Sequence, residues 1–455
     1  MRVERGRHKG KLTRHLWMMG MIVLLTVGCG VDQPLNLVIV MVDTLRADHL
    51  EFQGYERQVA PHLTELADRS VVLLNHHAHA SRTGPSVASL LTGLHPPSHG
   101  VVNPLTHFVA KGVLADEVTT LAEILRQANF ECHGVVTNPN VSARFGFSQG
   151  FDSYEYLEIL TAEEVNRHAA VLLQNTTSPF FLYLHYLEPH SPYDAPPAYR
   201  DRWVDSTYGG VFDGSHAQLD EVVAGTLIMD ESDQAQLEAL YDREIAYFDH
   251  QLGELLDLLE SRGLAENTIL VVVADHGEEF GDHGSALHGY TLYEEQLHVP
   301  CLIYDPRRVE PQRIEAITRN VDMAPTLLAQ LGVSWGGPFQ GEDLSPMLDG
   351  GAEGDPLEVY AHASLRAVRI VEASSYSVNG WKYIAHTLPE AREELFDLHT
   401  DPLERRNLIL ENPIRAEEMR HGLEAMVQTM PVVEGGVVQL TPEEQRRLKA
   451  LGYLE

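Results

Sequence analysis

The chain has 455 residues, of which 44% are hydrophobic, enough for a large core in one α/β domain with a smaller appended part. Lys and Arg total 33 against 66 Asp and Glu, so the formal net charge is -33. A charge of this sign argues against general nucleic-acid binding, and an anionic substrate would need local cations or a metal to offset it.

The N-terminal segment has a basic start followed by an apolar stretch, and this pattern predicts an export signal. Arg and Lys residues between positions 2 and 14 precede an apolar stretch at 16–27, which is short for a membrane span but typical of a signal peptide. The stretch ends at Gly28-Cys29, which resembles a bacterial lipobox with an acylated cysteine, although Thr26 is unusual in such a motif. Simple secretion and an uncleaved anchor are the alternatives. We assign residues 1–29 to this signal and expect a protein of the bacterial cell envelope, lipid-anchored or secreted.

The mature chain then contains two cysteines, Cys132 and Cys301. Two cysteines are too few for a disulfide framework or a zinc cluster. Both are predicted to be buried small hydrophobes.

Strand and helix patterns alternate from residue 36 onward. The predicted strands are 36–42, 132–137, 180–186, 268–274 and 301–304, and the predicted helices are 61–70, 86–94, 120–128, 233–262 and 323–331. The helix at 233–262 is the clearest, because its apolar residues recur at steps of three and four. The helix at 120–128 begins with a capping box formed by Thr120 and Glu123. The alternation predicts an α/β fold with a mostly parallel central sheet flanked by helices.

A Gly- and Pro-rich region at 336–354 indicates a boundary or a set of surface loops. Short strand patterns follow at 359–361, 375–378 and 381–385, and they predict a small appended sheet. We therefore expect a catalytic domain at 35–345, a small C-terminal antiparallel subdomain at 346–410 and a charged helical tail at 411–455.

Two apolar runs far apart in the chain, 36–42 and 268–274, each lead straight into an aspartate, Asp43 and Asp275. In open α/β sheets, ligands bind just beyond the carboxyl ends of such buried strands. His276 follows Asp275, so two carboxylates and one imidazole are predicted to converge on a single divalent cation. A single aspartate of this kind would carry little weight, because Asp is also a common turn and helix N-cap residue.

A third informative segment lies between the two aspartates. Pro85 suits the first turn of a helix, which places Thr83 and Gly84 at the helix N-terminus, where backbone N–H groups and the dipole favour an anion. A hydroxyl at this point is well placed to attack a bound oxyanion. From the residues alone, Thr83 can equally be an N-cap or loop residue.

Several ordered motifs resemble the sulfatase family of the alkaline phosphatase superfamily. They are DTLRAD at 43–48, PS at 85–86 with LLTG at 90–93, EPHSPY at 188–193, DHG at 275–277, TLYEE at 291–295, VP at 299–300, DMAPT at 322–326 and ELFDL at 394–398. The resemblance spans roughly residues 36–407, and so many motifs in one order argue against coincidence. It implies an alkaline phosphatase/sulfatase-like fold and hydrolysis of an ester at a divalent metal.

The resemblance also implies a metal site. Asp43, Asp275 and His276 would be the ligands, with the oxygen of Thr83 completing the set. Ca²⁺ is the usual cation of the family, whereas a histidine ligand favours Mn²⁺ or Zn²⁺.

Catalytic roles follow from the same resemblance. Thr83 would be the nucleophile, and His190 is the candidate to protonate the leaving alcohol or to stabilise the oxyanion. His288 is a candidate to share the role of His190. Asn103 is expected to contact the oxyanion as a substrate-binding residue.

Four positions depart from the family pattern. The usual nucleophile motif has Cys or Ser, then Pro two residues later and Arg two residues after that; aligned on Pro85, these end positions hold Thr83 and Val87. Threonine does not follow the formylglycine route, so we expect no formylglycine and a sulfo- or phospho-threonine that water hydrolyses. Thr44 stands where a second acid is frequent, and His288 stands where a lysine is usual.

The leading hypothesis is a metal-dependent hydrolase of a small-molecule or glycan sulfate ester. Three alternatives stay open: a phosphate mono- or diester hydrolase, a transferase of the phosphoglycerol or phosphoethanolamine type, and a non-catalytic binding protein on the same scaffold. The transferases usually have several membrane spans, and a decayed site need not keep chemically competent groups at Thr83 and His190. We expect no nucleic-acid partner, and membrane contact only through an N-terminal lipid anchor.

Overall fold

A computed structural model describes Met1 and residues 34–102, 110–158, 161–176, 179–203, 205–351, 354–433 and 435–450. The predicted export signal with Cys29 lies outside the described residues, as does Asn103, so these assignments stay predictions. Residues 34–455 group into one compact unit. Within the described ranges, no helix is both long enough and apolar enough to cross a membrane.

The centre of the unit is an eight-stranded sheet with the order β11-β2-β10-β7-β1-β6-β4-β5. The strands are β1 Asn36–Val42, β2 Val71–His77, β4 Glu131–Val136, β5 Ser153–Tyr156, β6 Phe180–Tyr186, β7 Thr268–Ala274, β10 Cys301–Tyr304 and β11 Gln312–Arg319. Only β10 runs antiparallel to its neighbours β2 and β7. The prediction of a mostly parallel sheet is confirmed.

Every residue of β1, β6 and β7 is buried, which explains why these strands are continuous apolar runs. Successive side chains of β1 point to opposite faces: Val38 and Val40 enter one core, and Leu37 and Ile39 enter the other. The sheet is therefore covered on both faces.

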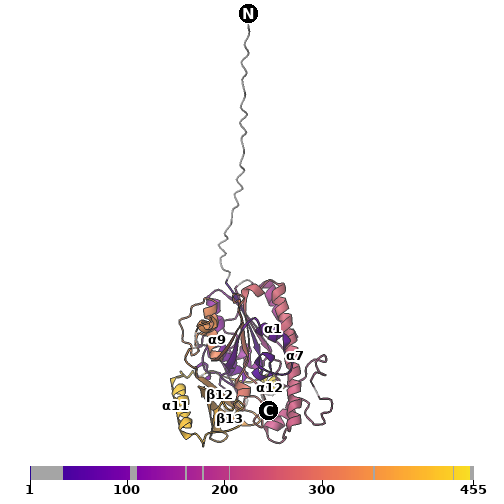
Figure 1. Cartoon of the computed structure of the whole chain (residues 1–455), viewed down its shortest axis with the longest axis vertical. Coiled ribbons are helices and arrows are strands. Elements are labelled where there is room, and N and C mark those ends of the chain that lie inside the picture. Colours follow the sequence, from indigo (N-terminus) through magenta and orange to yellow (C-terminus); the bar gives the residue numbers. More distant parts are fainter. Residues whose placement is uncertain are drawn as a thin grey trace. The chain divides into compact units, whose positions relative to one another are not determined.

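Helices form a layer on each face of the sheet. The first core receives side chains from α1 Pro61–Ala67, α5 Ala162–Asn175, α6 His216–Val223 and α7 Glu231–Ser261. The second receives them from α2 Thr83–Thr92, α4 Leu121–Gln127, α9 Asn320–Gln330, α10 Ser345–Leu348 and α12 Pro442–Ala450. Figure 1 shows α1 and α7 on one side of the sheet and α9 on the other. The predicted capping box of Thr120 and Glu123 is present at the start of α4.

A separate antiparallel sheet follows in the order β12-β13-β14-β15, made of Val359–Arg366, Ile370–Val378, Trp381–Leu388 and Arg392–Asp397. The helix α11, Pro413–Thr429, packs against it through Ala416, Met419 and Leu423. The predicted C-terminal antiparallel sheet is confirmed, with longer strands than expected. The remaining elements of the described ranges are α3 Pro96–His99, α8 Glu294–Leu297, β3 Ala110–Gly112, β8 Glu279–Phe280, β9 Ala286–Leu287, β16 Val437–Gln439 and five short 3₁₀ turns.

Candidate metal centre and active site

Asp43 and Asp275 leave the central sheet side by side. Strands β1 and β7 are parallel with Val42 opposite Ala274, so the next residue of each strand is the aspartate. Both side chains are fully buried. The backbone N–H of Thr44 donates to Asp275 Oδ1 at 3.2 Å, which ties the two strand ends together.

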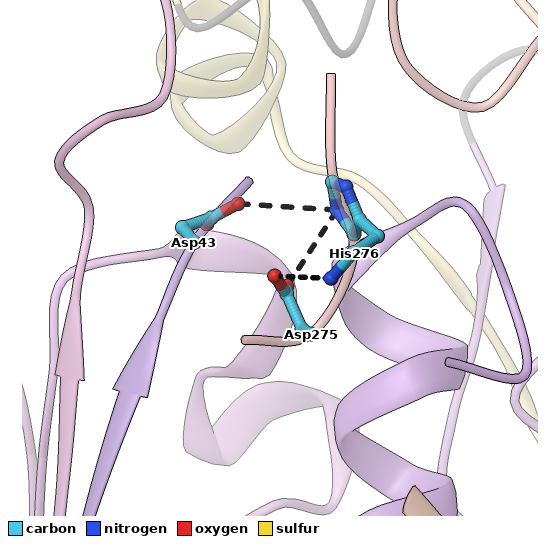
Figure 2. Close-up of side chains that lie close together, drawn as sticks. All are labelled: Asp43, Asp275 and His276. Carbon is cyan, nitrogen blue, oxygen red and sulfur yellow. Dashed lines mark hydrogen bonds and ion pairs between the residues drawn. The ribbon is translucent and has the colours of Figure 1, made fainter. Parts of the chain in front are cut away.

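His276 presents one ring nitrogen to both carboxylates. Its Nδ1 lies 2.9 Å from the carbonyl oxygen of Gly277, which places the proton on Nδ1 and leaves a lone pair on Nε2. Nε2 lies 3.6 Å from Asp275 Oδ2 and 3.9 Å from Asp43 Oδ1. Figure 2 shows both carboxylates directed at this imidazole.

The three side chains fit a divalent cation. Asp43 Oδ1 and Asp275 Oδ2 are buried and have no hydrogen-bond partner among the described residues. One ligand atom from each of Asp43, Asp275 and His276 lies within 4.8 Å of the others. Burial, and then the charge of Asp275, raise the pKa of Asp43 well above its usual value, and burial raises the pKa of Asp275. Two buried carboxylates and an imidazole are a donor set for a divalent metal, whose charge would offset their desolvation.

Thr83 lies beside this cluster as the first residue of α2. Its side chain is buried, and Oγ1 is 3.4 Å from His276 Nε2. Pro85 occupies the first turn of the helix, as predicted, because its missing N–H has no intrahelical acceptor there. The structure thus brings Thr83, Asp43, Asp275 and His276 together.

Asn138 links the hydroxyl to the cluster and was missed by the sequence analysis. Its Nδ2 donates to Asp43 Oδ2 at 2.5 Å and to Thr83 Oγ1 at 3.2 Å. Its Oδ1 accepts the backbone N–H of Asn140 at 2.9 Å, which fixes the orientation of the amide. Asn138 follows β4 by two residues, so the strand-end rule applied to Asp43 was an available signal for it.

A second polar network holds α2 against the end of β7. Ser86 Oγ donates to the carbonyl oxygen of Asp275 at 2.5 Å, and Asn320 Nδ2 donates to Ser86 Oγ at 3.2 Å. His76 Nε2 lies 2.9 Å from Asn320 Oδ1. This network connects α2, the end of β7 and α9.

His288 and His190 extend the site away from the cluster. The ring of His288 lies 4.5 Å from that of His276 and 4.9 Å from that of His190. Nδ1 of His288 is 2.9 Å from Glu278 Oε1, and Nδ1 of His190 is 2.5 Å from the carbonyl oxygen of Ser191. Burial, and then neighbouring histidines, lower the pKa of both rings well below the usual value, so both are neutral near pH 7. Each ring therefore offers Nε2 as a proton acceptor.

His185 is a further buried histidine that the sequence analysis did not single out. It lies on β6 with Nε2 at 3.9 Å from Asp43 Oδ2, and neither ring nitrogen has a hydrogen-bond partner among the described residues. Burial lowers the pKa of His185 to about 3, so the ring is neutral.

Comparison with known proteins agrees with this architecture. The sulfatase family model matches residues 35–333, and the model for the C-terminal part of N-sulphoglucosamine sulphohydrolase matches residues 281–430. An arylsulfatase of Clostridium perfringens is 24% identical over 444 residues, covering 82% of this chain and 90% of the relative.

Solved structures show the same fold. A structure in complex with its substrate D-glucosamine-2-N,6-O-disulfate aligns with a TM-score of 0.72 at 19% identity, covering 87% of this chain and 98% of that chain. The phosphonate monoester hydrolase of Agrobacterium radiobacter aligns with a TM-score of 0.71 at 18% identity, covering 90% of this chain and 100% of that chain. Because the family model also matches well over half of the sequence, the chain belongs to the sulfatase family of the alkaline phosphatase superfamily.

Proposed function

We propose that the protein is a metal-dependent hydrolase that cleaves a sulfate ester, with Thr83 as its nucleophile. One observation carries the proposal: a buried hydroxyl at the N-terminus of α2 lies 3.4 Å from His276 Nε2, beside two carboxylate oxygens that lack hydrogen-bond partners within the described residues. A hydroxyl placed beside an imidazole and two such carboxylates can be activated as a nucleophile toward an oxyanion ester.

Asp43, Asp275 and His276 would hold the cation, with Thr83 Oγ1 as a further ligand. When bound, a divalent cation supplies positive charge that makes a neighbouring hydroxyl more acidic and offsets charge on the reacting ester. Ca²⁺ is the cation usual in the family, whereas the imidazole ligand is better suited to Mn²⁺ or Zn²⁺.

The reaction proceeds in two displacements at sulfur. Thr83 Oγ1 forms a bond to sulfur while the bond from sulfur to the alcohol oxygen breaks, leaving a sulfo-threonine. The neutral pair His288 and His190 accepts the Thr83 proton and returns it to the leaving alkoxide, the last transfer being the role of His190. Water then attacks sulfur, the pair accepts its proton, and sulfate leaves as the Thr83 hydroxyl is restored.

Asn138 and Glu278 position these groups. The Asn138 amide donates to both Asp43 and Thr83, so it sets the direction of the hydroxyl relative to the carboxylate. Glu278 accepts from His288 Nδ1 and thereby keeps the lone pair of that ring on Nε2.

Hydrolysis of a phosphate mono- or diester is the second candidate, and the hydroxyl of Thr83 favours it. Sulfate and phosphate groups are tetrahedral oxyanions of similar size, so one fold accommodates either. One fold neighbour is in complex with a glucosamine disulfate, and another is a phosphonate monoester hydrolase, so the fold occurs with both sulfur and phosphorus oxyanion substrates.

The test is a panel of 4-nitrophenyl sulfate, 4-nitrophenyl phosphate and bis(4-nitrophenyl) phosphate with the metal-loaded protein. We expect sulfate to be turned over fastest, and Thr83→Ala to lose at least about 1000-fold in kcat while keeping its fold and metal content. Thr83→Ser should retain measurable turnover because it keeps a hydroxyl.

The matched control is Thr92→Ala, which removes a buried hydroxyl at the other end of α2, where it donates to the carbonyl of Ala88. Its kcat should stay within a few-fold of the wild-type value. Wild-type turnover by Thr83→Ala would overturn the nucleophile assignment, and phosphate turnover far above sulfate turnover would replace the first candidate with the second.

A further inference from the structure

His77 and His298 form a cross-strand pair at the end of β2. The two residues face each other in an antiparallel bridge, with backbone hydrogen bonds of 2.8 and 2.9 Å on either side of it. In a pair of this kind, the two side chains lie close together on one face. The ring centroids are 5.7 Å apart, and the ring planes are tilted by 31°.

The far nitrogen of each ring is held by an acceptor. Nε2 of His77 lies 3.0 Å from Glu294 Oε2, and Nε2 of His298 lies 2.8 Å from the carbonyl oxygen of Leu74. Both acceptors place the ring proton on Nε2, so each Nδ1 keeps a lone pair. His77 is 4% exposed, and its Nδ1 is buried without a hydrogen-bond partner in the described part of the chain. Histidines that ligate a metal are held in the same way by a carboxylate or carbonyl at the other nitrogen.

The pair lines an acidic cavity of about 950 Å³. The cavity lies between the edge strand β11, the loop that begins at residue 342 and the turn from β13 to β14. No lysine or arginine is among the described residues that line it, and Lys382, which bonds to the other oxygen of Glu294, lies outside the lining. The negative charge of the lining favours a cation. The acids of the lining are Glu294, Glu315, Glu342, Asp343 and Asp355.

The separation of the rings suits one shared ion. A Zn–N bond is about 2.1 Å long and the ring centre lies about 1.1 Å behind the nitrogen, so the centres of two rings on one ion are at most about 6.4 Å apart. The observed 5.7 Å is within this limit. Strand β10 lies between β2 and β7, so the pair is about 10 Å across the sheet from Asp275. The ion would therefore be separate from that of the Asp43 cluster.

We propose that His77 and His298 bind a divalent transition-metal ion of the Zn²⁺ type through their Nδ1 atoms. Imidazole nitrogens are preferred ligands of Zn²⁺ and of the neighbouring Ni²⁺ and Cu²⁺. Water completes the coordination, and the acids of the cavity supply the negative charge that attracts a cation. The ion ties the end of β2 to α8, which directly precedes His298. The site does not depend on Thr83 or on which ester the protein hydrolyses.

The test measures Zn²⁺ binding to the full-length Asp43→Asn chain by calorimetry, because this variant lacks one ligand of the other cluster. We expect it to retain one tightly bound Zn²⁺ per chain, and Zn²⁺ to raise its thermal unfolding midpoint. Adding His77→Gln should raise the Kd of this ion by about 100-fold or more and abolish the thermal shift. Glutamine keeps an N–H group that can donate to Glu294 but has no ring lone pair.

His298→Gln is the second variant, and it should weaken Zn²⁺ binding to the same degree. His168→Gln is the matched control, because His168 on α5 is also paired with a carboxylate, Glu155 Oε2 at 2.6 Å, and lies outside the cavity. Its Kd should equal that of the Asp43→Asn parent. An Asp43→Asn chain without tightly bound Zn²⁺, or a Kd within threefold of the parent in a folded His77→Gln or His298→Gln variant, would overturn the proposal. Equal weakening by His168→Gln would also overturn it.

Discussion

Asp43 and Asp275 end two adjacent parallel strands, and each keeps one buried carboxylate oxygen without a hydrogen-bond partner in the described part of the chain. Buried charges of the same sign are unfavourable unless a cation lies between them. We therefore expect the pair to destabilise the protein without a metal and to stabilise it when a divalent cation is added, and urea unfolding can measure both effects.

Asp43→Asn should raise stability in chelator and lower it with metal. In chelator at about pH 8, removal of one charge should raise the free energy of unfolding by about 1–3 kcal/mol, because the amide can still accept from Asn138. With Mn²⁺, Zn²⁺ or Ca²⁺, the affinity should fall by about 100-fold or more. Urea unfolding with and without metal, together with elemental analysis, checks both parts.

The control is Asp242→Asn, in which the buried carboxylate has partners on both oxygens. Arg57 and Tyr55 donate to Asp242 Oδ2 at 2.7 and 2.8 Å, and His49 Nδ1 lies 2.9 Å from Oδ1. Its loss should destabilise the protein by about 3 kcal/mol in either condition and leave the metal content unchanged. Equal metal content in Asp43→Asn and the wild type would contradict the metal assignment.

Asn138→Ala tests whether the Asn138 amide orients the Thr83 hydroxyl, because the hydroxyl itself stays in place. Loss of the shared amide removes one donor from both Thr83 Oγ1 and Asp43 Oδ2, so kcat should fall by about 10- to 100-fold and metal affinity by about tenfold. Asn166→Ala is the control. The partly buried amide of Asn166 on α5 donates to the carbonyl oxygen of Gln251 and accepts from the hydroxyl of Tyr186, away from the cluster. Identical kinetics for the two variants would show that Asn138 has no positioning role.

The strands that carry the site could be predicted from sequence because burial on both faces leaves a strong pattern. The predicted bounds of 36–42, 180–186 and 268–274 agree with β1, β6 and β7. Strand β2 received no prediction, because its apolar start is followed by Asn75, His76 and His77. The two histidine side chains hydrogen-bond to residues of other elements. The helix α5 was also not assigned, although Thr161 caps it by accepting the N–H of Glu164.

The side-chain contacts within the site were harder to predict from the sequence. The motif at 275–277 marked Asp275 and His276 as candidate ligands, but the lateral order of β7 beside β1, which brings Asp43 next to Asp275, depends on how the chain crosses over the sheet. Asn138 enters the site only because β4 neighbours β6, and Glu278 acquires its role only through contact with His288. Such contacts join residues distant in sequence, so a strand end can mark Asn138 as a candidate but does not reveal which side chains it contacts.

Glu188 should make stability depend on pH. Its side chain is 8% exposed, Oε1 accepts the N–H of Ala162, and burial raises its pKa to about 7 from an ordinary value of 4.5. Because the folded state holds this proton more tightly than the unfolded state, the contribution to stability is full below about pH 4.5 and is lost as the pH rises through about 7.

Glu188→Gln removes this titration. At about pH 8.5 the variant should be more stable than the wild type by up to about 3 kcal/mol, and at about pH 5 the difference should shrink. Urea unfolding at both pH values measures it, with the exposed Glu163→Gln on α5 as the control. Parallel pH profiles for Glu188→Gln and the wild type would refute the assignment.

Lys382 should anchor the C-terminal sheet to the catalytic core. It lies on β14, fully buried, with Nζ at 2.8 Å from Glu294 Oε1 and 2.9 Å from Glu404 Oε1. Lys382→Met removes the cation from the buried Glu404 and from the partly buried Glu294, which keeps its contact with His77, so the free energy of unfolding should fall by about 3 kcal/mol. Adding Glu294→Gln and Glu404→Gln removes the uncompensated charges and should recover most of that loss, because the penalty comes from uncompensated charge and not from lost packing.

Urea unfolding of the single and triple variants measures this recovery. A triple variant no more stable than Lys382→Met would show that packing, and not charge, holds the sheet in place.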